Sequence, residues 1–140
     1  MFTRSGSATW QGGLKDGNGT VSTQSGALKE LSYGFNKRFG DEPGTNPEEL
    51  IGAAHASCFS MALANMLSGA GLGGIDIKTT SKITLEKDGD GFTVTKAHLV
   101  TTISADGDKA QIRELAQQAK EGCPISKLLN AEVTMEATVA

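Results

Sequence analysis

The chain has 140 residues, a length that suits one compact domain with a hydrophobic core of its own. Its 13 Lys and Arg against 16 Asp and Glu give a net charge of −3, which argues against nucleic acid and anionic membrane surfaces as partners. The N-terminus has no apolar leader and no apolar stretch reaches the roughly 18 residues of a membrane span, so we expect a cytoplasmic protein.

The N-terminal third is predicted to form a meander of short β-strands. ATWQGG at 8–13, GTVSTQSG at 19–26 and YGFNKRF at 33–39 are β-type stretches separated by glycine-rich turns. In the third stretch the aromatic side chains are expected on one face, and Arg38 is out of phase with Phe35 and Phe39. From this pattern alone, the simplest interpretation of Arg38 is an exposed arginine on a strand.

A long helix is predicted to begin at TNPEE, residues 45–49. Asn46 is a good N-cap, Pro47 suits the first helical position, and the two glutamates that follow favour the positive end of the helix dipole. The helix is expected to end near Gly69 or Gly71. Apolar residues on nearly all of its faces predict burial on all sides, which requires a sheet or a second subunit around it.

The rest of the chain predicts a β-hairpin, two helices and a final strand. The DGDG turn at 88–91 joins the two hairpin strands, Gly122 is placed to end the first helix, and Pro124 lies in the first turn of the second. The stretches concerned are strands at 75–86, 92–104 and 131–139 and helices at 108–122 and 123–129.

Two other patterns are weaker signals. GAGLGG at 69–74 has the spacing of a dinucleotide motif, but it follows a helix and precedes a strand, the reverse of the required order, so it predicts only a connection. The two histidines and two cysteines lack zinc spacing, so neither a metal nor a cofactor is predicted. His55 lies one helical turn before Cys58 and is either its base or, more simply, a packing or hydrogen-bonding residue.

Cys58 and Cys123 are the candidate reactive residues. In a reducing compartment two cysteines rarely form a structural disulfide, so three interpretations remain: inert core thiols, metal ligands or a redox pair. Cys123 is expected at a helix N-terminus, where backbone N–H groups stabilise a thiolate. Burial in mid-helix is expected to raise the pKa of Cys58 and leave it inert unless a cation is close, and Arg38 is the best candidate for that cation.

The stretches GTVSTQSG, YGFNKRF, GTNPEELIGAAHASCFSMAL and GCPISKLL occur in an order and spacing that resemble, end to end, the osmotically inducible protein C (OsmC) branch of the OsmC/Ohr thiol peroxidases. The resemblance implies a single α+β domain over 1–140 with the OsmC-like fold, in which β-sheets pack around a long buried central helix. It also implies an intertwined homodimer with two active sites at the subunit interface. The implied activity is a cysteine-based peroxidase that reduces organic hydroperoxides, and hydrogen peroxide less well, in oxidative and osmotic stress defence.

The resemblance also assigns four site residues. Cys58 in HASCF matches the peroxidatic cysteine and Cys123 in GCP the resolving cysteine. Arg38 matches the arginine that activates the thiolate, and Glu48 the acid that orients this arginine. The implied cycle passes through a Cys58 sulfenic acid and a Cys58–Cys123 disulfide, which a dithiol reductant, expected to be of the lipoyl type, resets. The alternatives are a redox-responsive stress or ligand-binding protein with the same cysteine pair as its switch, and an inert dimer with core cysteines.

Two points concern the shape of this site. Four apolar side chains are candidates for a substrate pocket and equally for core packing: Phe35, Phe39, Phe59 and Met61. Glu48 and Cys58 are separated by about 15 Å on a straight helix, which excludes direct contact. Either the helix breaks near Gly52, or Arg38 bridges the distance, or two subunits assemble the site.

Overall fold

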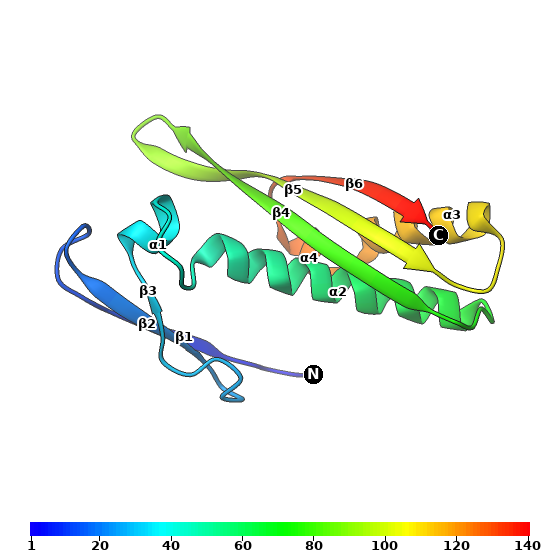
Figure 1. Ribbon diagram of the computed structural model, residues 1–140, viewed down its shortest axis with the longest axis horizontal. Coiled ribbons are helices and arrows are strands. Elements are labelled where there is room, and N and C mark those ends of the chain that lie inside the picture. Colours follow the sequence, from blue (N-terminus) through cyan, green and yellow to red (C-terminus); the bar gives the residue numbers. More distant parts are fainter. The chain divides into compact units, whose positions relative to one another are not determined.

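The computed structural model describes all 140 residues, in six strands and four helices (Figure 1). The chain divides into two compact units, Met1–Leu50 and Ile51–Ala140. Strands and helices are segregated along the chain rather than alternating, and the α+β class expected from the sequence is confirmed. The elements are β1 Gly6–Gln11, β2 Asn18–Thr23, β3 Leu31–Tyr33, α1 Phe35–Phe39, α2 Pro47–Gly69, β4 Asp76–Asp88, β5 Gly91–Ser104, α3 Lys109–Gly122, α4 Pro124–Leu128 and β6 Glu132–Val139.

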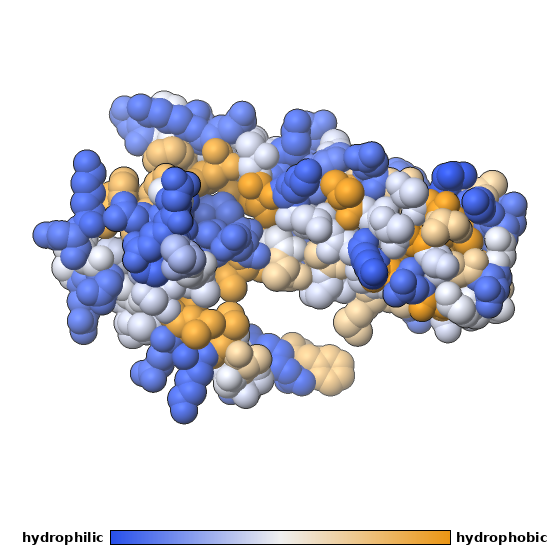
Figure 2. Space-filling view, in the orientation of Figure 1, coloured by the Kyte–Doolittle hydropathy of each residue, from blue (hydrophilic) through white to orange (hydrophobic).

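The first unit contains the predicted meander, an antiparallel sheet in the order β1-β2-β3. Gly19 lies opposite both Trp10 and Tyr33, and a Cβ atom there would collide with the Thr9 carbonyl oxygen and both rings. Glycine at this position therefore lets two aromatic rings from neighbouring strands approach each other across β2. Apolar side chains reach the surface over these strands (Figure 2), among them Leu31, which is partly exposed.

The third predicted strand is wrong beyond Tyr33, because the FNKRF part of YGFNKRF forms the short helix α1. Gly34 has extended backbone angles and separates the strand from the helix. Within α1, Phe35 and Phe39 are one helical turn apart and their ring centroids lie 5.1 Å from each other. Arg38 therefore lies in the last turn of a helix, not on a strand surface.

The bounds of α2 agree with the prediction. The Asn46 side-chain oxygen accepts a hydrogen bond from the Glu49 N–H group at 2.8 Å, Pro47 is the first residue, and the helix ends at Gly69. The helix does not break at Gly52, so that explanation of the Glu48–Cys58 separation is wrong. A Cβ atom at Gly52 would lie 2.8 Å from the carbonyl oxygen of Ser81, and glycine here allows β4 to pass close to the helix.

The prediction that α2 is buried on all sides is wrong for the single chain. Its buried residues form one stripe, Gly52, His55, Phe59, Leu63 and Leu67. On the opposite side the side chains are exposed, including Met61 at 76%. The expectation that no apolar stretch is long enough to span a membrane is wrong for α2, which could do so by length and composition. Its buried stripe, however, packs inside the protein as that of a core helix does.

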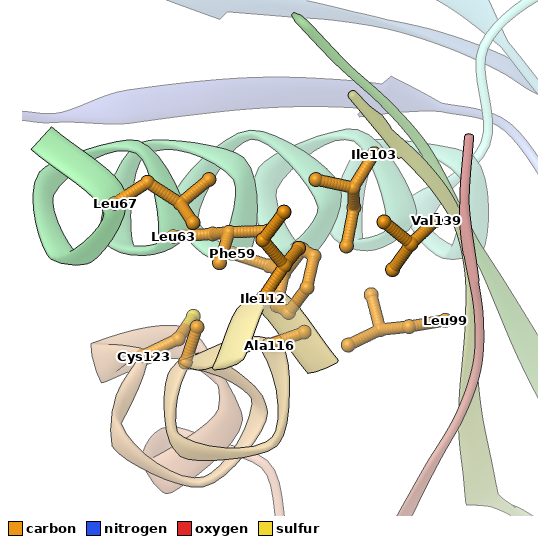
Figure 3. Packing of buried hydrophobic residues seen from close by; sticks show 10 residues of the cluster. Phe59, Leu63, Leu67, Leu99, Ile103, Ile112, Ala116, Cys123 and Val139 are labelled. Carbon is orange, nitrogen blue, oxygen red and sulfur yellow. The ribbon is translucent and has the colours of Figure 1, made fainter. Parts of the chain in front are cut away.

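The second unit carries the main core. Strands β4 and β5 form the predicted hairpin, turned by two residues of which Gly89 has φ of +59°, and β6 adds to β5 in parallel. The GAGLGG stretch is the connection from α2 to β4, as predicted. Helix α3 packs against the same core (Figure 3), whose members are Phe59, Leu63, Leu67, Leu99, Ile103, Ile112, Ala116, Ala119, Cys123 and Val139.

Candidate active site

The two cysteines lie in contact in the second unit. Cys58 is partly buried on α2, and Cys123 is fully buried between α3 and α4, with its side chain directed toward α2 (Figure 3). Both thiols are free, and they are joined by a hydrogen bond. Two thiols from separate elements are therefore neighbours, as the two partners of a disulfide must be.

The environment of Cys58 favours the protonated form of its thiol. Burial raises the pKa of Cys58, and the neighbouring Cys123 raises it further through the hydrogen bond and through charge repulsion. One contact acts in the opposite direction, because the backbone N–H group of Ile125 donates to the sulfur and lowers the pKa. The expectation that burial raises the pKa of Cys58 is confirmed.

Ile125 was not among the predicted site residues. It is the second residue of α4, after Pro124, which has no N–H group, so its amide is the first free donor of the helix. The signal in the sequence is the Cys-Pro start of α4. From it we expected the backbone N–H groups of this helix to stabilise a thiolate at Cys123. In the structure this amide donates to Cys58 instead.

His55 is fully buried, and each of its two ring nitrogens makes a hydrogen bond. Its Nδ1 lies 2.8 Å from the Ser81 hydroxyl and its Nε2 lies 2.8 Å from the Ser126 hydroxyl. Burial lowers the pKa of His55, so the ring is neutral near pH 7. The interpretation of His55 as a hydrogen-bonding residue rather than the base for Cys58 is confirmed.

Arg38 and Glu48 form a two-pronged ion pair in the first unit. Arg38 Nε lies 3.2 Å from both carboxylate oxygens of Glu48, and Nη2 lies 2.8 Å from Oε1. Glu48 lies in the first turn of α2, where the helix dipole also favours its charge. The neighbouring Glu49 instead accepts a hydrogen bond from Asn46 at 2.8 Å and so belongs to the helix cap.

An apolar cavity of about 280 Å³ lies beside Arg38 in the first unit. Of the four apolar candidates for a substrate pocket, Phe35 and Phe39 line this cavity. The other two candidates do not line it, since Phe59 is a fully buried core residue and Met61 is exposed on α2. The full lining is Trp10, Leu14, Tyr33, Gly34, Phe35, Arg38, Phe39 and Pro47, which we call the aromatic cavity.

Trp10 and Tyr33 of the aromatic cavity were not predicted. Trp10 donates from Nε1 to the Gly12 carbonyl oxygen at 2.9 Å, and Tyr33 donates from its hydroxyl to the Thr9 carbonyl oxygen at 2.8 Å. The polar atoms of both rings are thereby satisfied, and their apolar surfaces are left to line the cavity. The available signal was that they are the single tryptophan and the single tyrosine of the chain.

The structure thus brings together two of the predicted residue pairs, Cys58 with Cys123 and Arg38 with Glu48. The thiol pair belongs to the unit Ile51–Ala140, and the ion pair to the unit formed by residues 1–50.

Comparison with known proteins identifies the family. The family model of the OsmC-like proteins matches residues 40–138. The chain is 50% identical over 134 residues to peroxiredoxin OsmC of Escherichia coli (strain K12), with 95% of this chain and 94% of that protein covered. It is 32% identical over 120 residues to the organic hydroperoxide resistance protein OhrB of Bacillus subtilis (strain 168), with coverage of 84% and 86%.

The solved structures agree in fold. The crystal structure of an organic hydroperoxide resistance protein from Elizabethkingia anophelis matches with a TM-score of 0.74 at 26% identity, over 100% of this chain and 96% of that one. The expected OsmC-like fold and family resemblance are confirmed. The chain therefore belongs to the OsmC-like protein family, and it is a cysteine-based peroxidase with a role in stress defence.

Proposed function

We propose that this peroxidase reduces organic hydroperoxides at Cys58, with Cys123 as the resolving cysteine, Arg38 as the activating cation and Glu48 as the residue that orients Arg38. The observation that carries the proposal is the contact between two free thiols, one from α2 and one from the junction of α3 and α4. An inert pair of core thiols needs no such contact, whereas a peroxidase that forms a disulfide does.

The first step is attack of the Cys58 thiolate on the distal oxygen of the hydroperoxide. The oxygen–oxygen bond breaks, the sulfur becomes a sulfenic acid, and the leaving alkoxide takes up a proton to become the alcohol. Because burial raises the pKa of Cys58, the thiolate needs the positive charge of Arg38. The contacts with Glu48 use Nε and Nη2 of Arg38, so both N–H groups of Nη1 remain to face thiolate and peroxide.

The second step joins the two sulfurs. The Cys123 thiol attacks the Cys58 sulfenic sulfur, a disulfide forms, and water leaves. An external dithiol, which we propose to be of the lipoyl type, then reduces the disulfide by exchange and is itself oxidised to a disulfide. Their existing hydrogen bond supports this pairing, since the resolving sulfur already lies next to the sulfur it attacks.

The aromatic cavity is proposed to bind the organic group of the substrate. Arg38 forms part of its wall, so a peroxide group near the guanidinium would have its hydrocarbon part directed among the rings. Each methylene buried there contributes about 0.8 kcal/mol, a gain that hydrogen peroxide does not have. This supports organic hydroperoxides, including aryl hydroperoxides, as the preferred substrates.

The active form is proposed to be an intertwined, cytoplasmic homodimer of a single domain, 1–140, with its active sites at the subunit interface. Helix α2 is apolar on nearly all sides but is buried along one stripe only, and Met61 is exposed on the other side. A second subunit over this side would remove that apolar surface from water. Such a dimer would be detected by sedimentation.

Steady-state turnover with excess dihydrolipoyl dithiol tests the function. The expected result is continued consumption of cumene hydroperoxide, with a higher kcat/KM than for hydrogen peroxide. A redox switch would stop after about one equivalent of peroxide per chain, and equal kcat/KM values would remove the aromatic cavity from the proposal.

Mixing Arg38→Ala and Cys58→Ser proteins tests how the site is assembled. If Arg38 and Cys58 of different subunits form one site, the exchanged dimers regain activity that neither parent has. If the mixture stays inactive although subunits exchange, each site belongs to one subunit.

A further inference from the structure

The buried ring of His55 has no part in the chemistry proposed above, yet it links three elements of the second unit. It belongs to α2, its Nδ1 atom bonds Ser81 of β4, and its Nε2 atom bonds Ser126 of α4, both at 2.8 Å. No surface of the ring is exposed. A buried neutral imidazole with two hydroxyl partners holds a fixed orientation, because rotation of the ring would leave buried polar atoms unpaired.

Helix α4 is the shortest of the three elements that this link joins. It has five residues, and Ser126, the residue that His55 binds, is its single buried residue. The two residues on either side of Pro124 make the contacts that matter for chemistry: Cys123 bonds the Cys58 sulfur through its thiol, and Ile125 donates to the same sulfur through its backbone. The His55–Ser126 bond therefore holds the segment that carries both contacts, together with the packing of Cys123 and Ile125 in the core.

We propose that His55 is a positioning residue of the peroxidase cycle, whose hydrogen bond to Ser126 holds α4 so that Cys123 lies against Cys58. This inference rests on the proposed roles of the two cysteines. The bond to Ser81 anchors the ring to the sheet on the other side. The lowered pKa of His55 agrees with this role, because a neutral ring can donate from one nitrogen and accept at the other.

The step most sensitive to this positioning is disulfide formation. The Cys58 sulfenic acid and the Cys123 thiol combine to a disulfide and water, and the new sulfur–sulfur bond is about 2.05 Å long, shorter than a hydrogen-bond contact. The segment 123–126 must therefore move toward α2 in a defined direction. A misplacement of about 1 Å in such a step can reduce its rate on the order of 100-fold.

Two matched pairs of variants test the proposal. Ser126→Ala removes the hydroxyl on α4, and Ser81→Ala removes the hydroxyl on β4 from the same ring. In the second pair, His55→Gln places an amide about where Nε2 lies and keeps a bond to Ser126, whereas His55→Asn reaches only as far as Nδ1 and keeps the bond to Ser81. The second pair also decides the question if a serine variant fails to fold.

The measurement is mass spectrometry of quenched samples after one equivalent of cumene hydroperoxide, with a sulfenic-acid reagent present, alongside melting temperatures. We expect disulfide formation to slow about 10- to 100-fold in Ser126→Ala and His55→Asn, with trapped Cys58 sulfenic acid. In Ser81→Ala and His55→Gln it should stay within about threefold of wild type. The melting temperatures of the two members of a pair should be similar.

Equal disulfide rates within each pair would overturn the inference and make His55 a residue of stability alone. If the wild-type protein still forms the Cys58–Cys123 disulfide, such a result leaves the proposed function unaffected. If the wild-type protein forms no such disulfide, both the positioning role of His55 and the proposed function are overturned.

Discussion

A double-mutant cycle on Arg38 and Glu48 tests whether their ion pair works in the peroxidase reaction or only supports the fold. The cycle compares the wild type with Arg38→Ala, Glu48→Ala and the double variant. In the structure the pair makes three contacts, two of 3.2 Å from Nε and one of 2.8 Å from Nη2. The Arg38 side chain is 37% exposed and that of Glu48 is 14% exposed.

The expected contribution to stability follows from this partial burial. Exposed ion pairs contribute about 0 to 1 kcal/mol, and breaking a buried pair costs about 3 to 5 kcal/mol. The Arg38–Glu48 pair lies between these limits, and water reaches the arginine, so we expect a coupling of about 1 to 2 kcal/mol in the free energy of unfolding. Urea denaturation of the four proteins measures it.

The expected effects on the rate of Cys58 oxidation are larger than the expected effect on stability, and they differ between the two residues. Arg38→Ala should slow the oxidation of Cys58 by about 10² to 10³-fold, because it removes a fixed donor at a developing negative charge. Glu48→Ala should cost about tenfold, since it acts only by orienting Arg38. The double variant should therefore be no slower than Arg38→Ala. Arg38→Lys should recover little activity, because an ammonium group cannot bind the carboxylate with two nitrogens and still face the thiolate.

Stopped-flow measurement of a single oxidation by cumene hydroperoxide, at saturating and limiting concentrations, gives these rates. Additive losses in the double variant would refute the orienting role of Glu48. Wild-type oxidation in Arg38→Ala would refute the activating role of Arg38 and leave the pair as a support of the fold alone.

Three further predictions concern the cysteines, the aromatic cavity and pH. Cys58→Ser should consume no peroxide, while Cys123→Ser should react once and form a sulfenic acid that can be trapped and detected by mass spectrometry. Oxidation of Cys123 at the wild-type rate in Cys58→Ser would show that the roles of the two cysteines are reversed. Trp10→Ala or Phe39→Ala should lower kcat/KM for cumene hydroperoxide about tenfold and leave that for hydrogen peroxide unchanged, whereas equal losses would mean that the cavity does not bind substrate. Because burial lowers the pKa of His55, below pH 6.5 the unfolded chain binds a proton that the folded chain does not. The free energy of unfolding should thus fall as the pH is lowered from about 6.5 toward the folded pKa, and urea titrations of His55→Gln should lack this part of the slope.

Local signals in the sequence were sufficient wherever one element's own residues decide its structure. Asn46 and Pro47 predicted the start of α2 because capping uses only neighbouring atoms. The alternation of residues 75–86 and the turn at 88–91 predicted the β4–β5 hairpin for the same reason. The family resemblance then supplied the identity of the reactive residues.

Helix α1 shows where local signals were ambiguous. Phe35 and Phe39 are four residues apart, a spacing that places two side chains on the same side of either a strand or a helix. The aromatic pattern therefore could not distinguish the two. The packing of the two rings at 5.1 Å and the break at Gly34 belong to the helix.

The contacts of the candidate site were decided by tertiary structure. The raised pKa of Cys58 was predictable from burial, but the donor that opposes it, the amide of Ile125, comes from a helix far along the chain. Likewise, Trp10 of β1 lines a cavity with Tyr33 of β3 and Phe35 of α1, which lie more than 20 residues further along the chain. Spacing along a chain determines which side of an element a residue occupies, whereas only the packing of distant elements determines which donor, thiol or ring lies opposite it.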